Sequence, residues 1–390
     1  MNENQLGFNT LCTHAGEIRD EQFQGAISPL YMSTSYNYEG VDQKRYPRYF
    51  NTPNQEALAQ KIAALEKGEA ALIFGSGMAA ISTTLYSFLS QGDHCVVQGN
   101  IYGGTRNLVT KDLERFGISY TLTPHCTLTD FENALRPDTK VIYLETPSNP
   151  LLSIVDIESV VALAKRNNCI TIIDNTFASP VNQNPIPMGV DIVLHSATKY
   201  LGGHSDISAG AVITSQALLD VIFQKAINFG GNLSDFTVWL LERSIKTLGI
   251  RVQQQNKNAL AMAEWLVSLD EVKSVYYPGL SSHPEHDLAR KQMKGFGGML
   301  SFELTDEFET SVFMDSLQFI KKSMSLAGVE STILAPTQTS HSLLTAEERK
   351  QQGISDQLIR FSVGIEDVQD LQEDIRMALK QQTISTSLTT

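Results

Sequence analysis

Short apolar segments alternate with helical patterns over roughly the first 250 residues, and this alternation constrains the fold more than any other feature of the chain. Amphipathic helices lie between several of the segments, as at Ile157–Lys165. Such alternation predicts a mostly parallel sheet covered by helices on both faces. Ligand sites of these sheets lie beyond the carboxyl ends of the strands. Seven segments are strand candidates: 70–74, 94–97, 120–122, 141–144, 170–173, 192–194 and 211–214.

The pattern changes on either side of this sheet. Residues 1–50 are polar and rich in tyrosine among turn formers, which is typical of an arm that wraps over its own domain or a partner subunit. Beyond two long helical patterns (234–248 and 252–266), strand-like segments mix with helices at 308–318 and 367–378. We therefore expect an arm over 1–50, a large domain over 51–248, and a smaller C-terminal α+β domain over 249–390.

Composition excludes several classes of protein. The net charge of -13 argues against a nucleic-acid binder, which presents a basic face. No apolar run reaches the roughly 18 residues that a membrane span needs. The polar N-terminus lacks the pattern of a secretory signal. The four cysteines form no CxxC pair, so neither a metal site nor a disulfide framework is predicted, and a cytoplasmic location is expected.

The stretch from Asp191 to Asp206 carries the strongest chemical signal. A short apolar strand leads into Ser196, Thr198 and Lys199, and a Gly-Gly pair follows. On an extended segment the two hydroxyls would point the same way and hold one anion between them. A lysine beside them suits imine chemistry with a carbonyl compound. The alternative, a surface lysine at a loop entrance, is the commoner case for an arbitrary lysine.

Other polar groups follow strands in the same manner, and each has a structural alternative. Gly75-Ser76-Gly77-Met78 opens a helix whose N–H groups suit a phosphate, although a glycine turn there is common for geometric reasons. Asp174 directly follows a buried strand, where it serves either as a cap or as the partner of a cation. Residues 145–150 are typical of a proline-stiffened turn. Tyr102 either packs in a turn or stacks on a flat ligand.

These signals agree on one molecule. Pyridoxal 5′-phosphate (PLP) has a phosphate, an aldehyde, a ring nitrogen that a carboxylate keeps protonated, and a flat face. The residues assigned to these parts are Gly77, Met78, Ser196 and Thr198 for the phosphate, Lys199 for the aldehyde, Asp174 for the nitrogen and Tyr102 for the ring face.

The chain resembles the Cys/Met metabolism family of fold-type I PLP enzymes, which includes cystathionine γ-synthases, cystathionine γ-lyases, cystathionine β-lyases and methionine γ-lyases. The resemblance covers almost the whole chain, from near residue 10 to near residue 380. The matching motifs are Gly75-Ser76-Gly77-Met78-Ala79-Ala80, Tyr102-Gly103-Gly104-Thr105, Glu145-Thr146-Pro147-Ser148-Asn149-Pro150, Asp174-Asn175-Thr176-Phe177, Ser196-Ala197-Thr198-Lys199-Tyr200, Ser325-Leu326-Ala327-Gly328-Val329-Glu330-Ser331 and Arg360-Phe361-Ser362-Val363-Gly364.

The resemblance implies a role for each matching residue. Lys199 would bind the cofactor as an imine and move protons, Asp174 would pair with the ring nitrogen, and Tyr102 would stack on the ring and assist at the leaving group. Arg360 would bind the substrate carboxylate with help from Ser325. The other implied cofactor contacts are Gly77, Met78, Asn149, Thr176, Ser196 and Thr198, with Asn149 and Tyr46 also near the substrate.

The resemblance also implies an assembly. Tyr46 and Arg48 of the arm would reach the cofactor phosphate of a neighbouring subunit, so that each site is completed across a dimer. Such enzymes are usually homotetramers built from two dimers, they act on small sulfur amino acids in methionine and cysteine metabolism and in amino-acid biosynthesis, and neither nucleic acid nor membrane is an expected partner.

The chain departs from the family pattern at two places. Asn51-Thr52-Pro53 stands where Asn-Pro-Thr is common after the arm, and Asp235 stands where proline is frequent at a helix start. Gly104 replaces a cysteine that methionine γ-lyases often carry. Arg45 and Met324 stand where enzymes that act on cystathionine at the γ-carbon often have acidic residues, and Arg45 would either favour a distal carboxylate or face solvent.

The predicted reaction is elimination or replacement at the γ-carbon of cystathionine or of an O-acylhomoserine-type amino acid. Leu326 after Ser325 favours it, because β-lyases commonly have tryptophan there. Cystathionine β-lyase is the alternative, and methionine γ-lyase is a more distant one. A lysine-based lyase without PLP would leave Asp174 and the phosphate-binding residues without a role. A non-catalytic PLP carrier would not require Arg360 and Tyr102 together.

Overall fold

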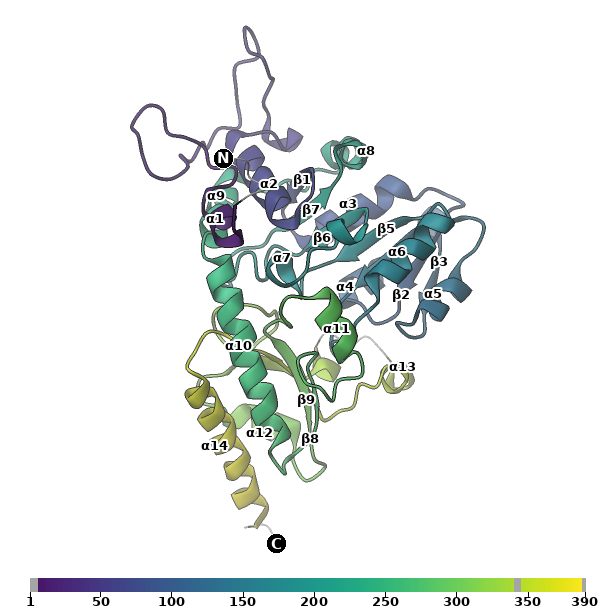
Figure 1. Cartoon of the computed structure of the whole chain (residues 1–390), viewed down its shortest axis with the longest axis vertical. Helices are drawn as coiled ribbons and strands as arrows, with labels where there is room; N and C mark the ends of the chain where they lie inside the picture. The colour runs from purple at the N-terminus through teal and green to yellow at the C-terminus, as the bar shows by residue number, and fades with distance from the viewer. Residues whose placement is uncertain (1–5, 340–344, 388–390) are drawn as a thin grey trace.

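The computed structural model describes residues 6–339 and 345–387. Two sheets lie one above the other in Figure 1, and the long helix α10 (Leu248–Val267) runs from the first toward the second. The helix α14 (Val368–Ser387) lies beside α10 at the C-terminal end. The sequence-based expectation of an α/β fold with a smaller C-terminal α+β part is confirmed.

The large sheet contains all seven predicted strands. Only β7 runs against its neighbours, so the sheet is mostly parallel, as predicted. Its order is β1 (Ala70–Phe74), β7 (Gly210–Thr214), β6 (Ile192–His195), β5 (Ile170–Asp174), β4 (Thr139–Glu145), β2 (His94–Gln98) and β3 (Ser119–Thr123).

Helices cover both faces of this sheet, which explains why its strands are apolar on both sides. One face packs against α2 (Pro53–Glu66), α5 (Leu128–Ala134), α6 (Ile157–Arg166) and α9 (Asp235–Ile245). The other face packs against α3 (Gly77–Phe88), the π-helical turn η3 (Leu108–Leu113) and α8 (Gln216–Phe229). Shorter elements connect them: α4 (Gly103–Asn107), η4 (Glu114–Phe116), α7 (Ser179–Asn182) and η5 (Ile186–Met188).

The second sheet forms the core of the C-terminal part together with α10, α12 (Thr310–Ser316) and α14. Its order is β10 (Lys321–Lys322), β11 (Thr332–Leu334), β12 (Leu358–Ser362), β9 (Met299–Leu304) and β8 (Val272–Tyr276). The remaining elements are α11 (His286–Gln292), η6 (Pro336–Gln338) and α13 (Ala346–Gln351). The helix α14 extends beyond the helix predicted at 367–378, because no glycine or proline follows residue 378 to end it.

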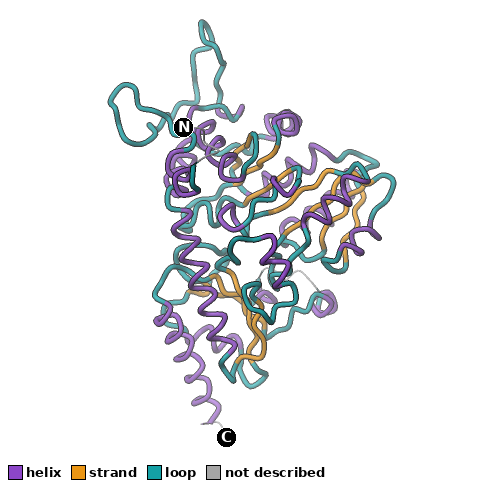
Figure 2. Tube along the Cα trace, in the orientation of Figure 1, coloured by secondary structure: helices purple, strands orange, loops and turns teal. Residues whose placement is uncertain are grey.

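The N-terminal residues are less irregular than the sequence suggests. Phe8–His14 forms the helix α1, which buries Cys12 against α2 and α10 of its own chain. From there to the short η2 (Pro47–Tyr49) the chain has no regular element, and two loops project from the body of the molecule (Figure 2). The loops carry exposed apolar side chains, including Phe23, Met32 and Tyr38.

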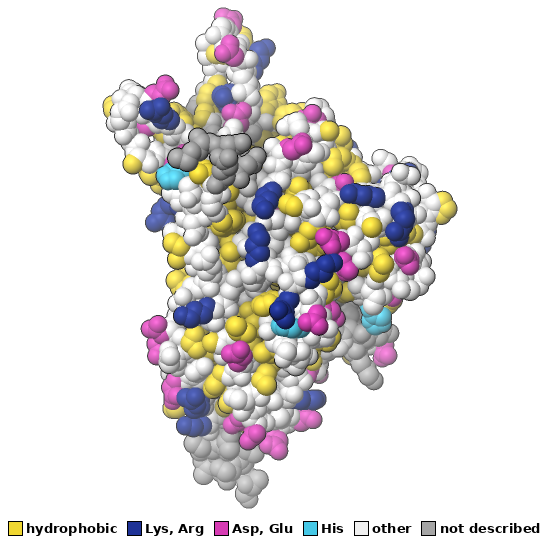
Figure 3. Space-filling model, viewed as in Figure 1, with side chains coloured by type: hydrophobic (Ala, Val, Ile, Leu, Met, Phe, Trp, Pro, Cys, Tyr) yellow, Lys and Arg dark blue, Asp and Glu magenta, His cyan; other side chains and the backbone are white. Residues whose placement is uncertain are grey.

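The surface carries mixed charge on the face seen in Figure 3, where Lys and Arg are interspersed with Asp and Glu and no basic stripe is visible. This agrees with the acidic composition of the chain. Among the described residues, no helix is long and apolar enough to cross a membrane.

Candidate active site

The carboxyl ends of three neighbouring parallel strands define the site. Glu145, Asp174 and His195 are the last residues of β4, β5 and β6, and Glu145 pairs in register with Asp174. Arg360 on β12 and the loop after β10 approach the same edge from the second sheet. Ligand sites were predicted beyond the carboxyl ends of the strands, and a cluster of polar groups from both sheets lies there.

Lys199 lies in a turn that follows β6, not on an extended segment as predicted. Its N–H donates to Ser196 O at 3.1 Å, and Gly203, with a φ of 70°, donates its N–H to Lys199 O at 2.7 Å. The chain turns because left-handed φ at Gly203 costs no Cβ clash. Ser196 and Thr198 consequently do not lie on one extended segment, and their joint binding of an anion stays a prediction. The Thr198 hydroxyl accepts from Ala209 N and donates to Ala209 O.

The amine of Lys199 meets the substrate-binding residues implied by the resemblance. Its Nζ donates to Ser325 Oγ at 2.5 Å. Arg360 donates to Ser325 O at 2.9 Å and to Asn149 Oδ1 at 3.0 Å. The structure thus brings Lys199, Ser325, Arg360 and Asn149 into one hydrogen-bonded group.

Charge and burial prepare this amine for nucleophilic chemistry. Burial, and secondly the nearby Arg360 guanidinium, lower the pKa of Lys199 to about 8. Burial also lowers the pKa of Arg360 to about 10, against the opposing charge of Glu145. Arg360 still carries its positive charge near neutral pH and is a fork-shaped donor for a carboxylate.

Asp174 is a buried carboxylate that accepts a hydrogen bond from Thr176 N at 3.0 Å. Burial raises the pKa of Asp174, and hydrogen bonds from Thr176 oppose that rise. Thr176 Oγ1 also accepts from Ser196 N at 2.8 Å, so it joins the ends of β5 and β6. A protonated ring nitrogen would give this carboxylate the cationic partner that burial makes necessary.

The start of α3 forms a cradle of groups that suit a phosphate. Ser76 caps the helix by accepting from Ala79 N, while N–H groups of a first turn lack intrahelical acceptors. A Cβ added to Gly77 would lie 2.9 Å from Ser196 Cβ, so these two residues touch and only glycine fits. Gly77, Met78 and Ser196 therefore converge, whereas the Thr198 hydroxyl is engaged by Ala209.

Tyr102 is half-exposed at the entrance to α4. A Cβ added to Gly104 would lie 2.5 Å from Tyr102 Cε1 and 3.0 Å from Met78 Sδ. The tyrosine ring and Met78 at the start of α3 therefore both lie close to Gly104. This leaves an exposed aromatic ring next to the phosphate cradle, as a stacking role requires.

Tyr46 and Arg48 lie apart from this group. Arg48 donates to Ile227 O at 2.6 Å and its guanidinium lies 5.7 Å from the Tyr46 ring centroid and 5.4 Å from that of Tyr49. Within the described residues, no hydrogen bond joins Tyr46 or Arg48 to Lys199 or to its partners. A shared site across two copies of the chain stays a prediction.

Sequence reasoning missed two buried carboxylates. Glu145 bonds the backbone of both Tyr102 and Asn149. Glu66 Oε1 accepts from His195 Nε2 at 2.5 Å, directly before Ser196. Glu145 carried the same signal as Asp174, a charged residue ending an apolar strand, but its motif was interpreted as a turn. Nothing in the sequence pattern indicated that Glu66 and His195 meet.

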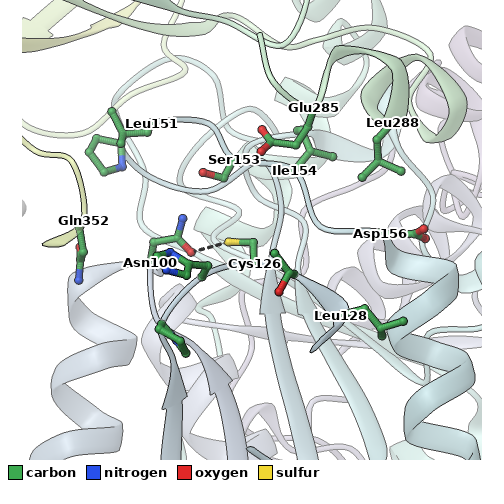
Figure 4. A pocket seen from close by; sticks show the side chains of 14 residues that line it. Asn100, Cys126, Leu128, Leu151, Ser153, Ile154, Asp156, Glu285, Leu288 and Gln352 are labelled. Atoms are coloured by element: carbon green, nitrogen blue, oxygen red, sulfur yellow. Dashed lines mark hydrogen bonds between the residues drawn. The ribbon is translucent and has the colours of Figure 1, made fainter. Parts of the chain in front are cut away.

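A cavity of about 420 Å³ lies beside the site (Figure 4). Asn100 and Cys126 face Leu151 and Ser153 across it, and Cys126 Sγ contacts Asn100 Oδ1 at 3.0 Å. Burial raises the pKa of Cys126 to about 12, so its thiol stays protonated. Among the described residues, none of those predicted to bind cofactor or substrate lines this cavity.

The donor set fits PLP at each of its parts. The residues present offer an amine of lowered pKa, a buried carboxylate, a helix start beside glycine, and an exposed aromatic ring. With PLP bound, Lys199, Asp174, Gly77 and Tyr102 would hold the aldehyde, the ring nitrogen, the phosphate and the ring face.

Comparison with known proteins agrees with this fit. Residues 9–380 match the family described as Cys/Met metabolism PLP-dependent enzyme. The chain is 45% identical over 370 residues to a cystathionine β-lyase of Lactococcus lactis, covering 94% of this chain and 97% of that protein. It is 44% identical over 375 residues to a cystathionine γ-lyase of Bacillus subtilis, covering 95% and 98%.

A solved structure is similarly close. The crystal structure of cystathionine γ-lyase from Lactobacillus plantarum complexed with L-serine superposes with a TM-score of 0.92 at 41% identity, covering 96% of this chain and 99% of that one. With a match over nearly the whole length in sequence and in structure, the chain belongs to the Cys/Met metabolism family of PLP-dependent enzymes.

Proposed function

We propose that this enzyme catalyses γ-elimination or γ-replacement on cystathionine or an O-acylhomoserine-type amino acid. The observation that carries the proposal is the group formed by Lys199, Ser325, Arg360 and Asn149. It holds a reactive amine close to a carboxylate-binding fork, which is the arrangement that an α-amino acid substrate requires.

Each residue of the group has a task that its surroundings favour. Arg360, fixed by Asn149 and by Ser325 O, binds the substrate carboxylate. This places the substrate α-carbon next to Lys199, whose neutral Nζ removes the α-proton and returns protons to the carbon chain. PLP, when bound, supplies an electron sink for the negative charge that develops there. Asp174 keeps the ring nitrogen of that sink protonated.

Leu326 supports chemistry at the γ-carbon, and the surroundings of Arg45 do not oppose it. Leu326, after Ser325, is buried in the apolar core of the large domain, where a bulky indole would not be accommodated without repacking. Arg45 donates to Glu56 Oε2 at 2.6 Å in its own chain, so its charge is compensated and it does not oppose a distal ammonium group. Met324 is largely exposed beside Ser325.

Two other activities compete with this one. Cystathionine β-lyase is the alternative, and the 45% identity to the L. lactis enzyme of that name favours it. Methionine γ-lyase is a more distant alternative, because a cysteine at position 104 would bring its Cβ within 2.5 Å of the Tyr102 ring.

The assembly proposed with this function is a homotetramer of two dimers with shared sites. Its support is the N-terminal arm, which on a single chain exposes apolar side chains such as Phe23, Met32 and Tyr38. Tyr46 and Arg48 would bind the PLP phosphate of the neighbouring subunit. We place the large domain at 51–248 and the small domain at 249–390, and we propose that the enzyme works in the cytoplasm.

A product assay tests the reaction. Purified enzyme is incubated with PLP and, separately, with cystathionine, methionine, cysteine, homocysteine or an O-acylhomoserine plus cysteine. We expect 2-oxobutanoate from γ-elimination or cystathionine from γ-replacement. Pyruvate from cystathionine, without 2-oxobutanoate, would establish β-elimination in its place. Protein that gains no visible absorbance with PLP would contradict the whole proposal.

A further inference from the structure

Glu145 is an ionisable residue in the middle of the site to which neither the PLP nor the substrate role has been assigned. It is the last residue of β4 and is 3% exposed. A carboxylate removed from water is costly unless hydrogen bonds compensate it. The structure shows what compensates Glu145, and the partners are residues of the site itself.

The two carboxylate oxygens accept from two different segments. Tyr102 N donates to Glu145 Oε2 at 2.7 Å, at the entrance to α4. Asn149 N donates to Glu145 Oε1 at 3.2 Å, in the loop after β4. Since Asn149 Oδ1 accepts from Arg360, one side chain connects the ring-stacking tyrosine to the carboxylate-binding arginine.

Glu145 is itself held in place from below. Gln98, fully buried at the end of β2, donates its side-chain amide to Glu145 O at 2.8 Å and accepts from Glu145 N at 3.0 Å. These bonds extend the β2–β4 ladder, whose last register pair is Val97 with Tyr143. The carboxylate therefore starts from a fixed backbone position on a rigid strand.

The surroundings of Glu145 make its ionised form unfavourable in free energy. Burial, and secondly the neighbouring Asp174, raise the pKa of Glu145, whereas the N–H bonds and Arg360 lower it. A neutral side chain would avoid both the burial cost and the repulsion from Asp174. Glutamine, however, has one acceptor oxygen and would turn its NH₂ group toward one of the two N–H donors. Among side chains of this length, only a carboxylate accepts both hydrogen bonds.

We propose that Glu145 is a positioning residue, which fixes the separation of Tyr102 from Asn149 and, through Asn149, of Tyr102 from Arg360. Bound PLP would lie against Tyr102, and the substrate carboxylate would lie against Arg360. Glu145 thus aligns the cofactor ring with the amino acid without touching either. The inference rests on the roles given to Tyr102 and Arg360 under the proposed function.

The test compares Glu145→Gln with wild-type holoenzyme. Three measurements are made: covalent trapping of PLP on Lys199 by borohydride, the visible circular dichroism of bound PLP, and kcat and KM for cystathionine or for the substrate that the product assay identifies. We expect PLP to be trapped on Lys199 still, with a dichroism changed by a less constrained ring. We expect kcat/KM to fall about tenfold or more, since a hydrogen bond to a charged group is lost.

Asp191→Asn is the matched control. Asp191 lies at the opposite end of β5 and β6, and its Oδ2 accepts from Thr171 N at 2.8 Å and Thr171 Oγ1 at 2.7 Å. The control should lower the melting temperature while leaving the dichroism and kcat/KM unchanged. A merely structural role of Glu145 would make its variant behave in the same way, which would overturn the proposal.

Two further outcomes are separated by design. If Glu145→Gln does not fold, Gln98→Met loosens Glu145 from below and should produce the same changes to a smaller degree; unchanged dichroism and kcat/KM in that variant would overturn the proposal. Wild-type protein that binds no PLP would overturn the proposed function and this inference together. If the wild-type enzyme turns over normally and Glu145→Gln has the same dichroism and kcat/KM as the wild type, only this inference is overturned.

Discussion

Two regions of the molecule differ in how many of their side chains find partners within one chain. One is the group of residues around Lys199, and the other is the N-terminal arm. Lys199, Ser325, Arg360 and Asn149 are joined by a chain of hydrogen bonds that links the two sheets. The arm exposes apolar side chains to solvent, with Phe23 79% and Met32 70% exposed. A single chain thus brings together the residues proposed for the chemistry, whereas its arm has apolar surface that another molecule could cover.

The largest expected effect is on the hydrogen-bonded group around Lys199. Lys199→Ala should lower kcat by at least about 10³-fold, because the variant loses both the nucleophilic amine and the proton carrier. The measurement is product formation at saturating PLP. Lys294→Ala, which removes another partly buried lysine whose Nζ donates to Asn184, is the control and should stay active. Comparable losses in both variants would contradict the special role of Lys199.

The next effect tests the fork. Arg360→Lys keeps the charge but cannot reach Asn149 and Ser325 O at once. We expect kcat/KM to fall about 10- to 100-fold, mainly through KM for the amino acid. Arg251→Lys is the control, since Arg251 is a buried arginine bonded to backbone carbonyls such as Tyr200 O. An unchanged KM in Arg360→Lys would remove the arginine from substrate binding.

The rate of PLP capture should depend on pH. The pKa of Lys199 is lowered to about 8, so the amine is protonated below that pH and neutral above it. Because only the neutral amine attacks an aldehyde, capture by the cofactor-free enzyme should slow about tenfold per pH unit below about pH 8 and level off above it. Arg360→Gln removes one cause of the lowering and should move the midpoint upward. Stopped-flow absorbance measures both; a flat profile between pH 6 and about 8 would contradict it.

The contribution of the N-terminal arm to a neighbouring site is tested by mixing variants. If sites are shared, co-expressed Lys199→Ala and Arg48→Ala chains form some dimers in which one site is fully wild type. Random pairing should then restore about a quarter of wild-type activity, although each variant alone is far less active. Two variants of the core, Lys199→Ala with Arg360→Lys, should show no comparable rescue. Absence of rescue in the first pair would place each arm at its own site or away from any site.

The smallest effect concerns the place where the arm joins the large domain. Thr52, which caps α2, donates its hydroxyl to Asp235 at the first turn of α9. Asp235→Asn should lower the free energy of unfolding by about 1 kcal/mol, through the weaker bond and the lost charge at a helix start. Denaturant unfolding measures it, with kcat as the control that should stay constant. A large loss of activity would show that this joint reaches the site.

Much of the fold was predictable because its signals are local. The seven strands are short apolar runs bounded by turn residues; Asp174 ends one of them, and Lys199 lies in the turn after another. The contacts between distant segments were not predictable. Nothing local indicates that Lys199 meets Ser325, or that Thr198 turns to Ala209 because the chain leaves the strand at Ser196.

The helix α1 shows the opposite limit. Its seven residues are too few and too mixed to give a clear helical period, and it is stable because Cys12 is buried against α2 and α10. Tertiary packing therefore decided its structure.

The contact between Thr52 and Asp235 has a consequence for anyone who exchanges segments between relatives. Thr52 lies in the segment after the arm, and Asp235 lies at a helix start, two places at which the chain departs from the common family pattern; the two residues are 183 apart in sequence. A chimera that imports proline at position 52 alone would remove the hydroxyl that faces Asp235, whose pKa burial already raises. Importing both residues together would avoid that stranded carboxylate. Thr52 and Asp235 should therefore be exchanged together or not at all.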